Sequence, residues 1–129
     1  MKKLALLMFC LFFFSFRNCY SSWKFVYKQS NGYDVYVNFE NIKSQNNLIY
    51  WNELVNFSES LAGIMSMTVF MEGDCKKVRQ RAITFMYYSE HFGNKFLKSS
   101  YSMSQRWVIL NEKSKHYALL KKICKNNIK

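Results

Sequence analysis

The sequence has 129 residues and a formal net charge of +11. This length allows one domain rather than two. Half of the residues are apolar and 19% are aromatic, so the chain can bury a core and is not intrinsically disordered. It has no proline and only 4 glycines, which excludes collagen-like and proline-rich architectures. No apolar run reaches about 18 residues, so we expect no conventional membrane-spanning helix.

Residues 1–21 have the organisation of a secretory signal peptide. Two lysines form a positive start, and residues 4–16 are almost continuously apolar but too short to span a bilayer. Cys19 and Ser21 are small residues that suit cleavage after Ser21. We therefore predict an exported domain of residues 22–129 in the periplasm, at the cell surface or outside the cell. The alternative is an uncleaved membrane anchor.

The cysteines divide between the signal and the mature domain. Cys10 and Cys19 fall in the signal, and neither follows the small residues of a lipobox, so contact with a membrane should be peripheral at most. Cys75 and Cys124 remain, and two cysteines in an exported chain favour one disulfide. Two buried free thiols are the alternative. A metal site is not expected, because two cysteines without a nearby histidine pair do not supply four ligands.

Charge is distributed unevenly along the mature domain. Residues 22–74 carry three basic and six acidic side chains, whereas residues 75–129 carry thirteen basic and two acidic ones. Such an asymmetry favours a basic surface that faces an anionic partner. The alternative is a set of solvated lysines that only aids solubility.

Most of the mature domain has the alternation of β-strands. Turn signals separate the segments, above all Asn31-Gly32, where both residues tolerate positive φ. The predicted strands are residues 23–28, 33–39, 48–57, 65–72 and a long segment 75–88 that follows a turn at Gly73-Asp74. Residues 44–47, 58–63 and 92–95 are predicted turns or loops, and residues 107–110 a short strand or connector.

The C-terminal residues change to helical spacing. Tyr117, Leu120 and Cys124 recur on one helical face, and Asn111 or Ser114 can cap the start of the helix. A short helix is marginal on its own, so we expect it to dock on the sheet. The predicted fold is α+β: an antiparallel sheet of about five to six strands with one C-terminal helix docked on one face.

The order of these features resembles the surface-adhesin protein E family of small secreted bacterial domains. The matching features run through nearly the whole mature domain. They are Trp23 at its start, Tyr36-Val37-Asn38, Asn41-Ile42, Tyr50-Trp51 with Leu54, Asp74-Cys75 with Arg79 and Arg81, Tyr87 or Tyr88, Gly93, Trp107 and Cys124. The ordered set, with one cysteine before a basic strand and another in the last helix, is more specific than any single feature.

The resemblance implies both a fold and a role. It implies an antiparallel sheet whose terminal helix is tied to one face by a disulfide between Cys75 and Cys124. The family's adhesin is an outer-membrane lipoprotein that binds host matrix and plasma proteins and haem, so a binding role is implied for this chain. The chain differs from that pattern in lacking a lipobox and in having Asn38 where the family commonly has Asp.

The sequence contains no recognisable catalytic or metal-binding motif. Glu72 and Asp74 are close carboxylates, which we interpret as part of a turn with local ion pairs rather than as a catalytic pair. We expect His116 to be exposed at the start of the helix, and we expect no haem contact through His91. The chain is therefore not expected to be an enzyme or to hold a cofactor.

The strongest candidates for partner binding are basic residues near the two cysteines. They are Lys76, Lys77, Arg79, Arg81, Lys121, Lys122 and Lys125. In a regular strand the side chains at 77, 79 and 81 would share the face of Cys75 and border the docked helix. Arginine suits bidentate binding of carboxylate, sulfate or phosphate. The alternative is that the two arginines pair with Glu53, Glu59 or Glu72.

These observations favour a non-enzymatic, adhesin-like binding module whose basic face holds an anionic protein or glycan of the host matrix or the cell envelope. Nucleic acid is not expected, because an exported domain rarely meets it and no motif supports it. The alternative function is a structural envelope component or an inhibitor of another exported protein.

Several predicted strands are apolar on both faces, for example at Tyr50-Trp51 and Val69-Phe70. One helix covers only part of one face, so the remaining apolar patch would be large for a monomer. A twofold homodimer would bury this patch. The alternative is that a loop, residues 58–64 or 92–104, folds across the open face.

Overall fold

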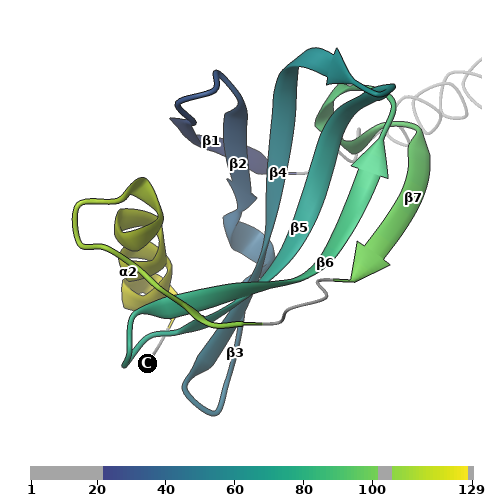
Figure 1. Cartoon of the computed structure of the whole chain (residues 1–129). Helices are drawn as coiled ribbons and strands as arrows, with labels where there is room; N and C mark the ends of the chain where they lie inside the picture. The colour runs from purple at the N-terminus through teal and green to yellow at the C-terminus, as the bar shows by residue number, and fades with distance from the viewer. Residues whose placement is uncertain (1–21, 102–105, 128–129) are drawn as a thin grey trace, which may run out of the picture.

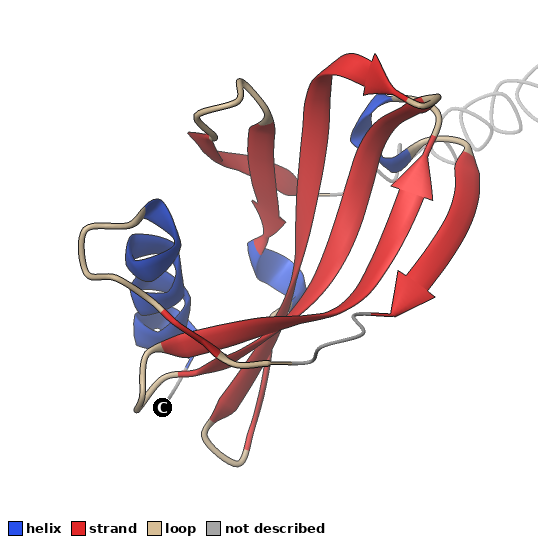
Figure 2. Ribbon diagram, in the orientation of Figure 1, coloured by secondary structure: helices blue, strands red, loops and turns tan. Residues whose placement is uncertain are grey.

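The computed structural model describes residues 22–101 and 106–127, which form an antiparallel sheet with a helix packed against it (Figure 1 and Figure 2). The predicted signal peptide lies outside the described residues. In chain order the elements are β1 Trp23–Lys28, β2 Asp34–Asn38, the 3-10 turn η1 Phe39–Asn41, β3 Lys43–Gln45, β4 Leu48–Leu61, β5 Ile64–Asp74, β6 Arg79–Tyr88, the 3-10 turn η2 His91–Gly93, β7 Phe96–Tyr101, β8 Val108–Ile109 and α2 Lys115–Asn127.

The sheet follows the order β1-β2-β4-β5-β6-β7, and all of its pairings are antiparallel. The long strands β4 and β5 form its centre. Two short strands extend it, because β3 pairs with β4 and β8 pairs with β6. The predicted fold, a sheet with one terminal helix, is confirmed, with six strands on the main path.

The β5–β6 hairpin differs from the prediction of a turn at Gly73-Asp74. Strand β5 continues through Asp74, and residues 75–78 make the turn. Within it Val78 has a φ of 46°, a left-handed conformation that is unusual for a β-branched residue. The Asp74 carboxylate supports the reversal, since its Oδ1 accepts the backbone N–H groups of Lys76 and Lys77 at 3.1 Å each.

The ends of other strands also differ from the prediction. Strand β4 extends to Leu61, so the predicted loop 58–63 is mostly strand. The predicted turn at 44–47 narrows to Asn46 and Asn47, both with positive φ, and this leaves room for β3. Strand β7 was not predicted, because its residues, all exposed, do not alternate.

Helix α2 packs on one face of the sheet, and the larger core cluster lies between the two (Figure 1). This core consists of Val37, Ile49, Trp51, Val69 and Met71 from the strands and Leu119, Leu120 and Ile123 from the helix. Gly73 allows the close approach, because a Cβ there would come within 2.7 Å of Leu120 and 2.8 Å of Trp51. Of the two caps that the sequence offered, Ser114 is the one in place, because its Oγ accepts the N–H of Tyr117 and the helix begins at Lys115.

The predicted disulfide between Cys75 and Cys124 is present, with a Cα–Cα distance of 5.9 Å. It joins the β5–β6 turn to the last turns of α2. The bond therefore holds the C-terminal end of the helix against the end of the central hairpin.

The opposite face of the sheet is partly covered by η2. A Cβ at Gly93 would lie 3.8 Å from Leu54, which is completely buried although it points away from α2. Beyond this cover the face keeps exposed apolar side chains, including Phe25, Phe70 and Met86. A loop within the predicted range 92–104 thus closes the centre of the face but not all of it.

Candidate partner-binding surface

Five lysines surround the disulfide, and we call them the lysine group. They are Lys76 and Lys77 in the β5–β6 turn and Lys121, Lys122 and Lys125 on α2. All five are exposed. The disulfide brings the turn and the end of the helix together, although they are distant in the sequence (Figure 1).

None of the lysine group forms an ion pair with an acidic residue of the described segments. Lys122 lies 5.0 Å from the ring centre of Phe39, which is a cation–π distance. The helix C-terminus carries partial negative charge and therefore tolerates lysines well. The five lysines thus keep their charge at the surface of the described part of the chain.

Arg79 and Arg81, which we call the arginine pair, are arranged differently. Arg79 Nε donates to Asp74 Oδ2 at 3.1 Å, and Arg81 Nε donates to Glu72 Oε2. Both acids are buried, and Glu72 also accepts the hydroxyl of Tyr50 at 2.8 Å. Each arginine side chain keeps only about a quarter of its surface exposed, at 26% and 28%.

Trp107 lies against both arginines. Their guanidinium carbons are 4.4 and 4.6 Å from the centre of its ring, within cation–π range. Next to Trp107, β8 pairs with β6 through Arg79 and Gln80. The arginine pair thus fastens the segment that leads into α2 onto the sheet.

Asp74 is the acid on which the turn depends. Its burial would raise the pKa of the carboxyl, but hydrogen bonds from the N–H of Lys77, the Arg79 side chain and the N–H of Lys76 outweigh it. The pKa of Asp74 is therefore lowered, and the carboxylate is the form that the folded chain favours.

The arginine pair does not lie on the face that the sequence analysis assigned to it. Gly73 faces α2, so the neighbouring Glu72 and Asp74 point to the other face, where they meet the arginines. The prediction that residues 77, 79 and 81 share the face of Cys75 is wrong, because a turn and not a regular strand follows Cys75. The alternative of ion pairing holds for Glu72, while Glu53 bonds to Trp51 instead.

The two histidines have structural contacts. His116 is half-buried rather than exposed, and its Nδ1 shares a 3.0 Å hydrogen bond with the Tyr27 hydroxyl. Burial lowers the pKa of His116. His91 Nε2 donates to the backbone carbonyl of Phe57 at 2.9 Å. Within residues 22–101 and 106–127, no three side chains gather in a way that could hold a metal ion.

No helix among the described residues is long and apolar enough to cross a bilayer. The same residues present the lysine group on one side of the disulfide and the paired arginines on the other face of the sheet. The two groups of basic side chains therefore differ in how much of their charge stays exposed to solvent.

Comparison with known proteins gives a family and a fold. The family model for surface-adhesin protein E matches residues 23–125. A crystal structure of Haemophilus influenzae protein E, in its second crystal form, superposes with a TM-score of 0.66 at 18% identity, covering 87% of this chain and 94% of that one. Another structure of the same protein gives a TM-score of 0.65 at 17% identity, with coverages of 84% and 88%. A comparison with curated proteins gave no match.

Proposed function

Because the chain belongs to the surface-adhesin protein E family, we propose that it is an exported, adhesin-like binding module that holds an anionic protein or glycan on its lysine group. The observation that carries the proposal is the exposure of five lysines around the disulfide without an ion-pair partner in the described segments. Charges of this kind attract a polyanion over several ångströms and strengthen binding at low salt.

The arginine pair has a supporting role in this proposal. Its positive charge is largely balanced by Glu72 and Asp74, two buried acids beside it. By holding Asp74, Arg79 helps to fix the turn that presents Lys76 and Lys77. The lysines therefore make the contact with the partner, and the arginines keep the presenting turn in place.

Export is part of the proposal and is supported by the disulfide between Cys75 and Cys124, since such bonds persist in oxidising compartments outside the cytosol. The predicted signal of residues 1–21 would deliver the chain there. N-terminal sequencing of the exported protein should give a start near Ser22. Intact Met1 in a membrane fraction would support the anchor instead.

Self-association is proposed for the edge of the sheet that carries β7 and β8. Exposed apolar residues gather on these strands: Phe96, Leu97 and Tyr101 on β7, and Val108 and Ile109 on β8. An edge strand with such side chains is prone to pair with a second copy, most simply as a twofold dimer. Sedimentation at micromolar concentration should give a dimer mass, and Leu97→Lys should give a monomer. A monomer mass for the wild-type chain would exclude this interface.

The test of the binding site compares two lysine sets with the same change in net charge. In the first variant Lys76, Lys77, Lys121 and Lys125 are replaced by Ala. In the control, exposed lysines outside the group, Lys24, Lys43, Lys98 and Lys113, are replaced. On immobilised heparin the first variant should elute at a clearly lower salt concentration than the control. Equal elution of both variants would mean that only net charge matters and that the lysine group is not a site.

Capture of partners then separates the two candidate functions. Anionic host-matrix components held by the lysine group should be released by high salt. An exported protein that stays bound in high salt, and equally to both lysine variants, would favour the alternative of a structural component or inhibitor.

A further inference from the structure

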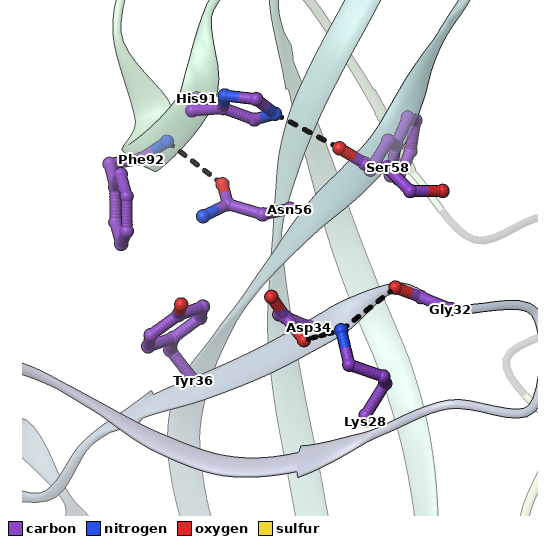
Figure 3. A pocket seen from close by; sticks show the side chains of 9 residues that line it. Lys28, Gly32, Asp34, Tyr36, Asn56, Ser58, His91 and Phe92 are labelled. Carbon is purple, nitrogen blue, oxygen red and sulfur yellow. Dashed lines mark hydrogen bonds and ion pairs between the residues drawn. The ribbon is translucent and has the colours of Figure 1, made fainter.

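We propose that a hollow at the end of the sheet remote from the lysine group binds a single neutral sugar ring. The hollow has a volume of about 320 Å³ and opens beside the β1–β2 hairpin and η2 (Figure 3). This is near the lower limit for small-molecule sites in proteins, which suits one ring better than a chain of rings. Strand β4 runs from Leu48, at the end nearest the lysine group, past Asn56 at the hollow. At roughly 3.3 Å per residue, these two positions are about 25 Å apart.

Asn56 provides a directed donor at the base of the hollow. It is only 8% exposed, and it lies opposite Asp34 in the register of β2 and β4. Its Oδ1 accepts the backbone N–H of Phe92 at 2.9 Å, which fixes the orientation of the amide. Figure 3 shows its nitrogen pointing toward the side on which Phe92 and Tyr36 lie. This nitrogen has no hydrogen-bond partner among the described residues, so it can donate to a ligand.

The charges of the hollow balance each other. Lys28 Nζ lies 2.5 Å from Asp34 Oδ1 and also donates to the carbonyl of Gly32. In Figure 3 the second carboxylate oxygen of Asp34 points to the side on which Tyr36 lies. The charges of Lys28 and Asp34 are already paired with each other, so neither is left to pair with an ionic ligand. A hydroxyl group of a neutral ligand, in contrast, can donate to one polar group of the hollow and accept from another. The hollow therefore favours a neutral ligand with several hydroxyl groups.

Two aromatic rings form an apolar wall next to these polar groups. The rings of Tyr36 and Phe92 meet edge to face with centres 5.2 Å apart. Phe92 is 49% exposed and has a φ of 57°, which costs free energy for a residue with a side chain. Two hydrogen bonds hold it there, one to Asn56 and one from the neighbouring Gly93 N–H to Ser66 Oγ. A bulky apolar ring is thus held in a fixed, exposed position.

A pyranose combines the two properties that this hollow would recognise. One face of the ring presents C–H groups, which pack on the electron-rich face of an aromatic ring. Its edge presents hydroxyls that act as both donors and acceptors and match Asn56, Asp34 and the Tyr36 hydroxyl. No charge on the ligand is required, in contrast to the partner of the lysine group.

The experiment uses the exported protein and a panel of methyl glycosides of glucose, galactose, mannose and N-acetylglucosamine. Saturation-transfer NMR at millimolar concentration should detect binding of at least one of them, with little dependence on salt. Tyr36→Phe removes the hydroxyl, and Phe92→Asn removes the ring while keeping a residue that tolerates positive φ. Each should weaken binding about tenfold or more, equivalent to 1.4 kcal/mol. Phe70→Asn, which removes an exposed aromatic ring elsewhere on this face, should leave binding unchanged.

Several outcomes would overturn the proposal. These are the absence of saturation transfer from every glycoside, and binding that Tyr36→Phe and Phe92→Asn both leave intact. If salt and the quadruple lysine variant abolish the signal while Tyr36→Phe does not, the sugar is held by the lysine group and the hollow is not the site. Since Tyr36→Phe keeps the ring and its packing, it tests the site even if Phe92→Asn does not fold.

Discussion

The lysine group and the arginine pair carry the same sign of charge, and Lys77 and Arg79 are only two residues apart, yet the fold treats the two groups in opposite ways. Lys77 is exposed and lacks an ion pair in the described segments, whereas Arg79 is bonded to a buried acid and lies against Trp107. One region keeps its charge for a ligand, and the other uses its charge inside the molecule. A count of basic residues in the sequence cannot separate these two uses.

The difference has a geometric cause. In the β5–β6 hairpin the register places Glu72 opposite Arg81 and Asp74 opposite Arg79. Side chains that are directly opposite on one face of an antiparallel pair are near enough to form ion pairs. The lysines at 76 and 77 lie in the turn, outside the ladder, and have no residue opposite them. Position in the hairpin therefore decides which basic residues are neutralised.

The disulfide holds the lysine group together, and its loss should have the largest effect. Closing a loop with a sequence separation of 49 residues stabilises a chain by about 4 kcal/mol in the loop-entropy model. We expect Cys124→Ser to lower the free energy of unfolding by about that amount and to weaken retention on heparin. Urea unfolding and alkylation of the exported protein check this. Two alkylatable thiols in the native wild-type protein would contradict the bond itself.

Removing the arginine pair should have the next largest effect. Arg79→Ala with Arg81→Ala leaves two buried carboxylates without their cations and frees Trp107. Because breaking a buried ion pair leaves an uncompensated charge, we expect a loss of about 2–4 kcal/mol in the free energy of unfolding. Chemical denaturation measures it. Unchanged stability together with lost heparin binding would instead make the arginines direct contacts of the partner.

Much of the fold could be predicted from local patterns, because each of these patterns depends only on residues that are close together in the sequence. The alternation of β1 and β4, the Asn31-Gly32 turn and the cap at Ser114 are of this kind. The β5–β6 turn was misplaced because Gly73-Asp74 is a usual turn signal, whereas here Asp74 ends β5 and its carboxylate supports a later turn that contains a left-handed valine.

The candidate site was harder to predict for a related reason. The seven basic residues could be named from charge alone, but their partners could not. Trp107 reaches the arginines across more than twenty residues of intervening chain, and the pairing of acids with arginines depends on the hairpin register. Because the turn was predicted at the wrong residues, the arginine pair was assigned to the wrong face of the sheet. The hollow at Asn56 also escaped prediction, because it joins two strands and a distant loop.

Glu53 sharpens the comparison, because it is a buried acid without an ion-pair partner among the described residues. It bonds to Trp51 Nε1 at 2.9 Å, and burial raises the pKa of its carboxyl above the ordinary 4.5. Because the pKa of Glu53 is raised in the folded state, the protonated carboxyl makes its full contribution to the free energy of unfolding below pH 4.5. This contribution is lost as the pH rises through the folded-state pKa. We therefore expect Glu53→Gln to increase stability at pH 7. The gain should disappear below about pH 4.5, where the wild-type carboxyl is protonated in both states. An equal gain at both pH values in urea unfolding would show that ionisation of Glu53 is not the cause.

The smallest effect on stability is expected for the lysines next to the arginine pair, although the change in charge is the same. Lys76→Ala with Lys77→Ala removes two cations, as the double arginine substitution does, and leaves intact the backbone N–H groups that bond to Asp74. Exposed side chains without specific partners usually contribute within about 0.5 kcal/mol, so the free energy of unfolding should change by no more than that. Heparin retention should nevertheless fall, because these side chains are free to meet a polyanion.

The two double variants, unfolded in urea side by side, separate charge used for folding from charge available for binding. A loss above about 1 kcal/mol for the lysine variant would mean that its charges serve the fold, because surface changes rarely cost so much.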